Sequence, residues 1–315
     1  KILDRDAIFL FFNYSYIPSP KSIFRDIAKL EAASILRLAK NSTDFKIEKY
    51  WSNDFNSKIN KTSRYKESLD EASNHLENLL YNKIQDQLNS KVSSGTFLSG
   101  GIDSSLITAI SSKLVNGNLK TFNIGFDEKN YDESVYANKI AKHLGTDHYT
   151  ENLKEKNVKD IISNIHNFYS EPFADSSQIP SIFLNQIAKK EITVALSGDG
   201  GDEIFGGYNR YFYTKKYYPL VNKIPYNLRV LLSKIFYSVK AENYNVFFKN
   251  ISYIFPGLSS FSNYGDKIHK ISKIIKYKNI NDLYNLLISN SFSTLKKSIV
   301  LNSSEKYLIH DLNMY

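Results

Sequence analysis

The sequence predicts an α/β fold, with a doubly wound parallel sheet followed by a C-terminal helical subdomain. Short apolar or β-branched runs alternate with amphipathic helical segments between residues 65 and 196, which is typical of a parallel sheet covered by helices. Two of these runs lead into glycine-rich loops, as expected where ligands bind at the carboxyl ends of strands. Beyond Gly207, segments rich in Lys, Tyr, Leu and Ile continue without a strand pattern.

The first 64 residues have a different pattern. A Pro-Ser-Pro turn signal at 18–20 predicts short mixed strands up to residue 51. Residues 53–64 are rich in Asn, Ser and Lys, which predicts a linker. An amphipathic helix is then expected over residues 65–88, because Leu and Ile recur there at helical spacing.

The alternating part of the chain gives the predicted core. Gly145 is expected to end a helix as its C-cap, and the β-branched run at 192–196 is typical of a buried parallel strand. In chain order we expect a strand at 95–98, a helix at 104–114, a strand at 119–126, a helix at 133–144, a strand at 146–151, helices at 158–169 and 179–190, and a strand at 192–196.

Composition excludes several classes of function. The chain of 315 residues contains no Cys, which excludes disulfides, thiolate metal sites and a cysteine nucleophile within it. Its net charge of +9 comes mostly from Lys, since only 6 of the 41 basic residues are Arg. Nucleic-acid surfaces usually depend on Arg, and Lys shares AT-rich codons with the abundant Asn, Ile and Tyr. We therefore favour genome composition over a functional basic face as the cause of the charge, and we expect no nucleic-acid partner.

No segment resembles a membrane span or a secretory leader. The longest apolar run, Ala7 to Phe12, is far shorter than the roughly 20 residues that a span requires. We therefore expect a cytoplasmic protein without a membrane partner.

The first glycine-rich loop has the composition of a phosphate site. It runs from Ser99 to Ser105 (SGGIDSS) between a strand and a helix. Its glycines let backbone N–H groups face a ligand, and its hydroxyls and the helix N-terminus add donors and partial positive charge. It lacks the Gly-Lys-Ser/Thr ending of a Walker loop. Asp103 would repel phosphate unless a cation lay between them, which predicts a Mg²⁺ ligand; the alternative is that Asp103 only caps the helix.

The second loop, from Ser197 to Glu203 (SGDGGDE), places three carboxylates within five residues at a strand end. Such a cluster is costly unless cations neutralise it. Asp202 is the better candidate for a second Mg²⁺ ligand, and Asp199 could orient a substrate or a reacting amine. The alternative is a solvated acidic turn.

These motifs resemble those of known proteins. The Ser99–Ser104 segment resembles the pyrophosphate loop of the ATP-pyrophosphatase (PP-loop) superfamily, which cleaves ATP between its α- and β-phosphates. Together with five further segments it resembles the synthetase domain of the glutamine-hydrolysing asparagine synthetase family, and the resemblance implies a sheet of the adenine-nucleotide α-hydrolase-like type. The five segments are 121–126 (TFNIGF), 131–134 (YDES), 141–146 (AKHLGT), 171–180 (EPFADSSQIP) and 196–208 (LSGDGGDEIFGGY).

The resemblance implies a role for individual residues. Leu98 and Ile124 would frame the adenine, and Asp103 and Asp202 would hold Mg²⁺. Asp199 would be the catalytic carboxylate that acts on the acyl-adenylate, although family members often have Glu there. The implied ATP-contacting residues are Leu98, Ser99, Gly100, Gly101, Asp103, Ser104, Ile124, Ser197 and Gly198.

The resemblance also implies a reaction and its partners. A carboxylate, most simply that of aspartate, would react with ATP to give an acyl-adenylate and pyrophosphate, and ammonia derived from glutamine would then displace AMP. Residues 1–62 resemble the end of an N-terminal glutaminase-type domain plus a linker, and residues 63–315 the ATP-binding synthetase domain. Glutamine hydrolysis needs a cysteine that this chain lacks. We therefore expect a fragment, truncated at both ends, that binds ATP and turns over poorly or not at all; the resemblance leaves a homodimer open.

Several alternatives remain at this stage. The acceptor could be a sugar or secondary-metabolite carboxylate, the chain could be a tRNA-modifying ATP pyrophosphatase, or it could be a non-catalytic ATP-binding module. The loop from Glu171 to Gln178 could border the acceptor site, as the resemblance implies, or be a plain turn between helices. His143 and His148 have no third ligand nearby in the sequence, so we favour ordinary histidines over a metal pair.

Overall fold

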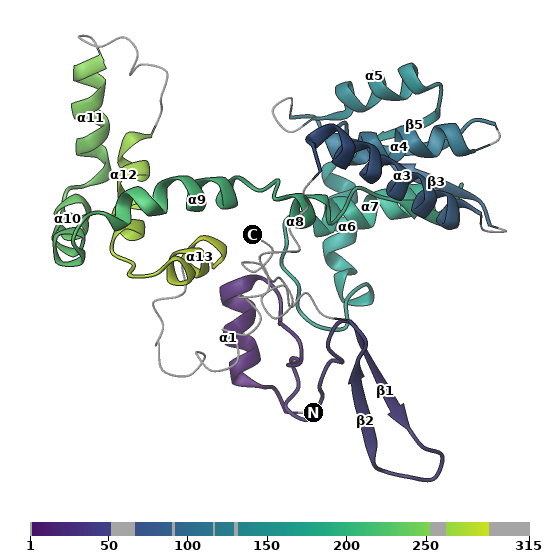
Figure 1. The fold of residues 1–315 in the computed structure, drawn as a ribbon, viewed down its shortest axis with the longest axis horizontal. Helices are drawn as coiled ribbons and strands as arrows, with labels where there is room; N and C mark the ends of the chain where they lie inside the picture. The colour runs from purple at the N-terminus through teal and green to yellow at the C-terminus, as the bar shows by residue number, and fades with distance from the viewer. Residues whose placement is uncertain are drawn as a thin grey trace. The chain divides into compact units, whose positions relative to one another are not determined.

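The computed structural model describes residues 2–51, 67–89, 92–115, 117–128, 132–252 and 263–289. The chain divides into two compact units between Phe205 and Gly206 (Figure 1). The boundary that the sequence predicts near residue 62 lies outside the described residues, so it stays a prediction. In the described ranges, no helix combines the length and the apolar character that a membrane crossing requires.

The first unit is built on a parallel sheet of four strands: β3 (Ser94–Phe97), β4 (Lys120–Gly125), β5 (Asp147–Asn152) and β6 (Val194–Leu196). Their order across the sheet is β5-β4-β3-β6, and every neighbouring pair is parallel. The chain thus starts in the middle, moves outward through β4 and β5, and returns to the other side of β3. This reversal confirms the doubly wound prediction, and it makes the gap between β3 and β6 the topological switch point of the sheet.

Helices connect the strands and cover both faces of the sheet. Because crossovers between parallel strands are right-handed, the connections on the two sides of the reversal lie on opposite faces. Leu196 of β6 packs with Ile84 and Ile110 on one face. The helices of this unit, apart from the N-terminal one, are α3 (Leu69–Leu88), α4 (Ile102–Leu114), α5 (Ser134–Leu144), α6 (Glu155–Ser163), α7 (Gln178–Ala188) and α8 (Gly201–Phe205).

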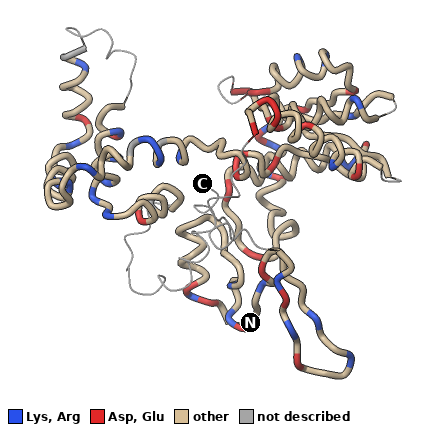
Figure 2. The backbone as a smooth tube through the Cα atoms, in the orientation of Figure 1, with Lys and Arg blue, Asp and Glu red and all other residues tan. Residues whose placement is uncertain are grey.

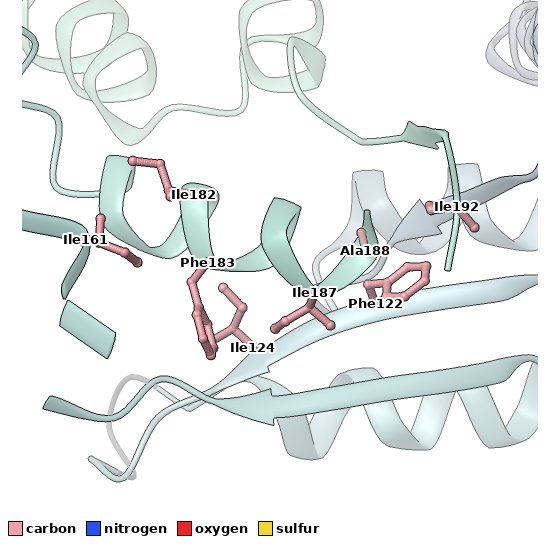
Figure 3. Close-up of a cluster of buried hydrophobic side chains, with 8 residues drawn as sticks. All are labelled: Phe122, Ile124, Ile161, Ile182, Phe183, Ile187, Ala188 and Ile192. Carbon is pink, nitrogen blue, oxygen red and sulfur yellow. The ribbon is translucent and has the colours of Figure 1, made fainter. Parts of the chain in front are cut away.

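The larger apolar core lies on the opposite face. Figure 3 shows Phe183 and Ile187 of α7 directed toward Ile124 and Phe122 of β4. The alternation along β4 explains this, since Phe122 and Ile124 share one face of the sheet while Thr121 and Asn123 lie on the other.

The predicted core elements agree with the structure except for details. The helix expected at 158–169 is shorter, because α6 ends at Ser163 and a 3₁₀ turn (Ile165–Asn167) follows. The Asn164 side chain donates to the carbonyl of Asp160 at 2.9 Å, which accompanies this break. Gly145 has φ +67° and caps α5, as predicted.

The prediction for the N-terminal residues is wrong in part. Residues expected in short strands form helix α1 (Arg5–Tyr14). The Asp4 side chain caps it by accepting hydrogen bonds from the backbone N–H groups of Asp6 (2.8 Å) and Ala7 (3.3 Å). Ala7 and Leu10 are buried at a spacing of three, which suits a helix and not a strand.

An antiparallel hairpin follows, formed by β1 (Ser34–Leu38) and β2 (Phe45–Lys49). The register pairs Leu36 with Ile47 and Leu38 with Phe45 on one face. All four of these side chains are exposed. The other face carries the ion pair between Arg37 and Glu48. The hairpin is therefore amphipathic.

The described residues of the second unit, 206–252 and 263–289, contain helices and no strand, as predicted. Helix α12 packs against α10 and α11, and α13 packs against α9. Tyr284 is fully buried, stacks on Tyr211, and accepts a hydrogen bond from Arg210; burial raises the pKa of its hydroxyl. The helices are α9 (Asn209–Asn222), α10 (Tyr226–Ser238), α11 (Ala241–Ser252), α12 (Tyr264–Ile275) and α13 (Ile280–Ile288).

Basic residues are frequent in the second unit. Figure 2 shows Lys and Arg recurring along α9 and α12. Acidic residues are few in both helices. The excess positive charge of the chain is therefore concentrated in the helical unit and not in the unit that carries the glycine-rich loops.

Candidate active site

The two glycine-rich loops lie at neighbouring strand ends. The first, residues 99–105, follows β3, and the second, residues 197–203, follows β6. Because β3 and β6 are adjacent and parallel, both loops emerge at the same carboxyl edge, at the switch point of the sheet. This is where doubly wound proteins bind ligands.

The first loop is closed by hydrogen bonds among its own residues. The hydroxyl oxygens of Ser99 and Ser104 are 2.9 Å apart, and the backbone N–H of Gly101 donates to the Ser99 hydroxyl at 3.3 Å. Gly100 has φ +90°, and a Cβ at this position would lie 2.8 Å from the Cβ of Tyr136 on α5. Only glycine satisfies both conditions without strain. The loop therefore forms a tight turn whose backbone follows the surface of α5.

A buried pair of threonines supports this loop from below. The Thr108 hydroxyl donates to the carbonyl oxygen of Ser104 at 2.7 Å, and it lies 2.9 Å from the hydroxyl of Thr96. Neither threonine is exposed to solvent. These bonds connect β3 to the first turn of α4 and so fix the direction in which the loop enters the helix.

Asp103 does not cap α4, so that alternative is wrong. The N-cap residue is Gly101, and no side chain caps the helix. Asp103 lies in the first turn instead, half-buried, where a carboxylate is stabilised by the helix dipole. Its side chain remains available for a role other than capping.

The second loop packs directly on Asp103. A Cβ at position 198 would lie 2.6 Å from the backbone nitrogen of Ser104, and a Cβ at position 201 would lie 2.7 Å from Cγ of Asp103. Real Cβ atoms essentially never come this close. At position 198 the neighbour is backbone, so the approach requires glycine, whereas at position 201 the neighbour is the end of the Asp103 side chain, which would have to move. Gly201 directly precedes Asp202 in α8. The structure thus brings the chain at Asp202 close to the Asp103 carboxylate.

Asp199 lies at the exposed tip of the second loop. Its Oδ2 accepts a hydrogen bond from the Ser197 hydroxyl at 3.0 Å, and its own N–H donates to that hydroxyl at 3.4 Å. This small turn holds the Asp199 carboxylate at the carboxyl edge of the sheet, accessible from solvent.

The two carboxylates fit a magnesium ion that is shared with a phosphate ligand. Within the described part of the chain, no three His, Cys, Asp or Glu side chains form a group that could hold a metal by themselves. Mg²⁺ usually keeps several waters and is bound through one or two carboxylates plus substrate phosphates. Asp103 and Asp202, beside a loop of backbone N–H and hydroxyl donors, match this donor set.

The predicted adenine-framing residues are both buried. Leu98 packs with Ala137 and Ala141 under α5, and Ile124 belongs to the core beneath α7. Their side chains are therefore engaged in packing, and the Leu98 N–H donates to the carbonyl of Phe122 at 2.9 Å.

Sequence reasoning overlooked Asn123. It lies between Phe122 and Ile124 and is 5% exposed. Its Nδ2 donates to the carbonyl of Leu98 at 2.8 Å, which fixes the end of β3 where the first loop begins. Among the described residues its Oδ1 has no hydrogen-bond partner. A polar residue inside an apolar strand was the signal that could have identified it.

Two other predicted features have clear partners. Asp132, in the segment 131–134, accepts hydrogen bonds from the N–H groups of Ser134 (3.1 Å) and Phe126 (3.4 Å), and the bonds with Ser134 lower the pKa of its carboxyl. Tyr131 lies outside the described residues. Both ring nitrogens of His148 bond threonine hydroxyls, and burial lowers its pKa.

The 171–178 loop reaches the same edge of the sheet. Helix α7 begins at Gln178 and leads back to the start of β6, so its N-terminus lies at the edge where β6 ends. The loop also bonds the N-terminal segment, because the N–H of Ala174 donates to the carbonyl of Ser15 at 2.8 Å. The loop is therefore connected to a distant part of the chain, and its place beside the acceptor site stays a prediction.

Comparison with known proteins agrees with the geometry. The profile of the asparagine synthase family matches residues 75–306. A candidate glutamine-hydrolysing asparagine synthetase of Methanocaldococcus jannaschii is 34% identical over 235 residues, which are 74% of this chain and 44% of that protein. Glutamine-hydrolysing asparagine synthetase 1 of Bacillus subtilis is 30% identical over 230 residues, which are 73% of this chain and 35% of that protein.

The chain spans less than half of the length of these two relatives. Among solved structures, NMN synthetase from Francisella tularensis superposes with a TM-score of 0.33 at 16% identity, over 44% of this chain and 59% of that one. The family match covers most of the chain, including both glycine-rich loops. The chain therefore belongs to the asparagine synthase family.

Proposed function

We propose that this chain carries the synthetase half of an ATP-dependent amide-forming ligase. It would activate the side-chain carboxylate of aspartate as an acyl-adenylate and transfer ammonia to it. The single observation that carries this proposal is the packing of Gly198 and Gly201 against Ser104 and Asp103, because it joins a phosphate-binding loop and an acidic loop into one site.

ATP is a substrate of this reaction, and the first loop would hold its phosphates. The backbone N–H of Gly100, the hydroxyls of Ser99 and Ser104, and the start of α4 would offer donors to an anion. Ser197 and Gly198 would contact the nucleotide from the second loop. Leu98 and Ile124 would present backbone edges to the adenine.

Asp103 and Asp202 would hold Mg²⁺ between the loops and the phosphates. When bound, the ion supplies charge neutralisation for the phosphates and the leaving pyrophosphate. Asp199 would orient the acceptor or the incoming ammonia, since its carboxylate is held at the exposed tip of the second loop by Ser197.

The chemistry needs positioning more than covalent catalysis. An oxygen of the acceptor carboxylate bonds to the α-phosphorus while the bond to the bridging oxygen of pyrophosphate breaks. Ammonia then attacks the acyl carbon, the carbon–oxygen bond to AMP breaks, and the nitrogen loses a proton. Ammonia would come from glutamine hydrolysed elsewhere, because this chain has no cysteine.

Residues 1–62 are proposed as the end of a glutaminase-type domain and its linker. In support of this, residues 2–29 enclose a buried cluster of their own, formed by Ala7, Ile17 and Ile23. Asparagine synthetases among the relatives favour aspartate as the acceptor.

Oxygen-18 transfer tests the proposed reaction. Aspartate labelled with ¹⁸O in its side-chain carboxylate is incubated with the chain, ATP, magnesium chloride and ammonium chloride, and AMP is examined by mass spectrometry. We expect one ¹⁸O in AMP for each asparagine formed, because the carboxylate oxygen stays with AMP when ammonia attacks. Formation of ADP with label in inorganic phosphate, or asparagine formed without labelled AMP, would contradict the proposal. Label transfer from another carboxylate but not from aspartate would change the identity of the acceptor and leave the proposed reaction type standing.

A further inference from the structure

The N-terminal segment has an internal framework of its own. Antiparallel bridges join Leu3 to Phe24 and Lys21 to Ala28. The ammonium group of Lys21 also pairs with the carboxylates of Asp4 at 3.0 Å and Asp6 at 3.4 Å. Residues 2–29 therefore hold together before any contact with the sheet is considered.

One ion pair joins this segment to the 171–178 loop. The Lys29 ammonium donates to Oε1 of Glu171 and to the carbonyl oxygen of Ile17. The backbone N–H of Ile23 donates to Oε2 of the same glutamate at 3.3 Å. Both carboxylate oxygens of Glu171 are thus bonded to the N-terminal segment, across 142 residues of sequence.

Partial burial makes this contact stronger than a surface ion pair. The Lys29 and Glu171 side chains are 34% and 22% exposed, so solvent screens them only in part. Removing the lysine would leave a half-buried carboxylate with one backbone donor, which is unfavourable. A second bond, from the N–H of Ala174 to the carbonyl of Ser15, lies three residues further along the loop.

The other two loops of the edge are held differently. Contacts of the 99–105 loop run to Thr108 and Tyr136, and contacts of the 197–203 loop run to Asp103 and Ser104. The 171–178 loop, in contrast, is tied to residues 15–29. The carboxyl edge therefore has two loops that pack against each other and a third that is bonded to the N-terminal segment.

We propose that Lys29 and Glu171 are positioning residues that set the 171–178 loop for the carboxylate acceptor, so that the N-terminal segment controls acceptor binding without affecting ATP. This inference deepens the proposed function and rests on it for the identity of the acceptor. Its consequence is a coupling between the part of the protein next to the ammonia supply and the site where ammonia is used.

Two measurements test the pair in the 315-residue chain. Hydrogen–deuterium exchange of Lys29→Met and Glu171→Gln should be several-fold faster in the 171–178 peptide, with the 99–105 and 197–203 peptides unchanged. In aspartate-dependent ATP–pyrophosphate exchange, both variants should raise the KM for aspartate by about three- to tenfold, the range of a half-buried ion pair, and leave the KM for ATP unchanged. Lys29→Arg, which keeps the charge and the donors, should restore both readouts.

A matched ion pair serves as the control. The Lys120 ammonium and the Glu191 carboxylate are 2.7 Å apart, and their side chains are 34% and 36% exposed, similar to Lys29 and Glu171. Lys120 begins β4 and Glu191 lies shortly before β6, away from the carboxyl edge. Glu191→Gln should change neither the 171–178 exchange nor the KM for aspartate.

The outcomes separate this inference from the proposed function. Unchanged exchange in the 171–178 peptide would overturn the positioning role whatever the activity. Equal losses for aspartate and ATP, or no effect on the KM for aspartate in an active protein, would overturn it as well. A wild-type chain without aspartate-dependent pyrophosphate exchange would count against the proposed function, and the deuterium exchange would still decide whether the ion pair holds the loop.

Discussion

The two glycine-rich loops occupy the same edge of the sheet but are held in different ways. Hydrogen bonds among neighbouring residues close the first loop, and the buried Thr96–Thr108 pair supports it. The second loop has its position fixed by close packing of Gly198 and Gly201 against residues of the first. The first loop therefore depends on its own hydrogen bonds and on the approach of Gly100 to α5, and the second depends on the first.

This difference determines at which glycine an alanine substitution displaces a loop. A loop that is closed by several of its own hydrogen bonds can lose one contact and keep its conformation. At Gly198, by contrast, an added Cβ would lie less than 3 Å from backbone atoms of the first loop, so even a methyl group requires the second loop to move. Gly198 of the second loop and Gly101 of the first, which has no such close backbone neighbour, should therefore respond differently to alanine.

Gly198→Ala should weaken ATP binding more than either Gly101→Ala or Asp199→Ala does. The new Cβ would lie 2.6 Å from the Ser104 nitrogen and 2.9 Å from the carbonyl carbon of Asp103, so the second loop must shift away from the first. We expect ATP binding, measured by equilibrium dialysis with Mg²⁺, to weaken by more than about tenfold, in line with an overpacking cost of about 1–3 kcal/mol. Amide formation should fall at least as much.

Gly101→Ala is the matched substitution in the first loop. Its Cβ would meet only the Ser99 hydroxyl, at 3.4 Å, which is an ordinary contact. ATP binding should change less than about threefold, because the added methyl group displaces no backbone. Equal losses for Gly198→Ala and Gly101→Ala would contradict the proposed difference between the loops.

Asp199→Ala should have a narrower effect. Asp199 lies at the exposed tip of the second loop and bonds only to Ser197 in the contacts described above, so its removal should not displace the loop. We expect ATP affinity to stay within about twofold while amide formation falls by about 10²-fold, the scale of a lost electrostatic contact in the transition state. Parallel losses of binding and amide formation would instead assign Asp199 a structural role.

Much of the sheet could be predicted because its signals are local. Buried strands such as β4 alternate with helices whose apolar residues recur at helical spacing, and Gly145 marks a helix end. The glycine-rich loops were recognisable for the same reason. Helix α1 was missed because the Pro-Ser-Pro signal after it suggested strands. Its start is marked by a single capping residue, Asp4.

Other features depend on distant residues and left no local signal. Nothing near Glu171 in the sequence points to Lys29, 142 residues away. The closeness of Gly201 to Asp103 likewise follows from the order of β3 and β6 in the sheet. The sequence alone predicted two carboxylates as candidate Mg²⁺ ligands, but only the fold shows that their loops lie side by side.

Both loops are proposed to form one Mg²⁺–ATP site, and the variants Asp103→Asn and Asp202→Asn test this proposal. Aspartate-dependent pyrophosphate release is measured over a magnesium titration, with Asp86→Asn on the exposed surface of α3 as the control. We predict that each of the two loop variants abolishes magnesium-dependent release, because a single remaining carboxylate holds the ion poorly, and that the control keeps wild-type release. Unchanged release from both loop variants would contradict the claim.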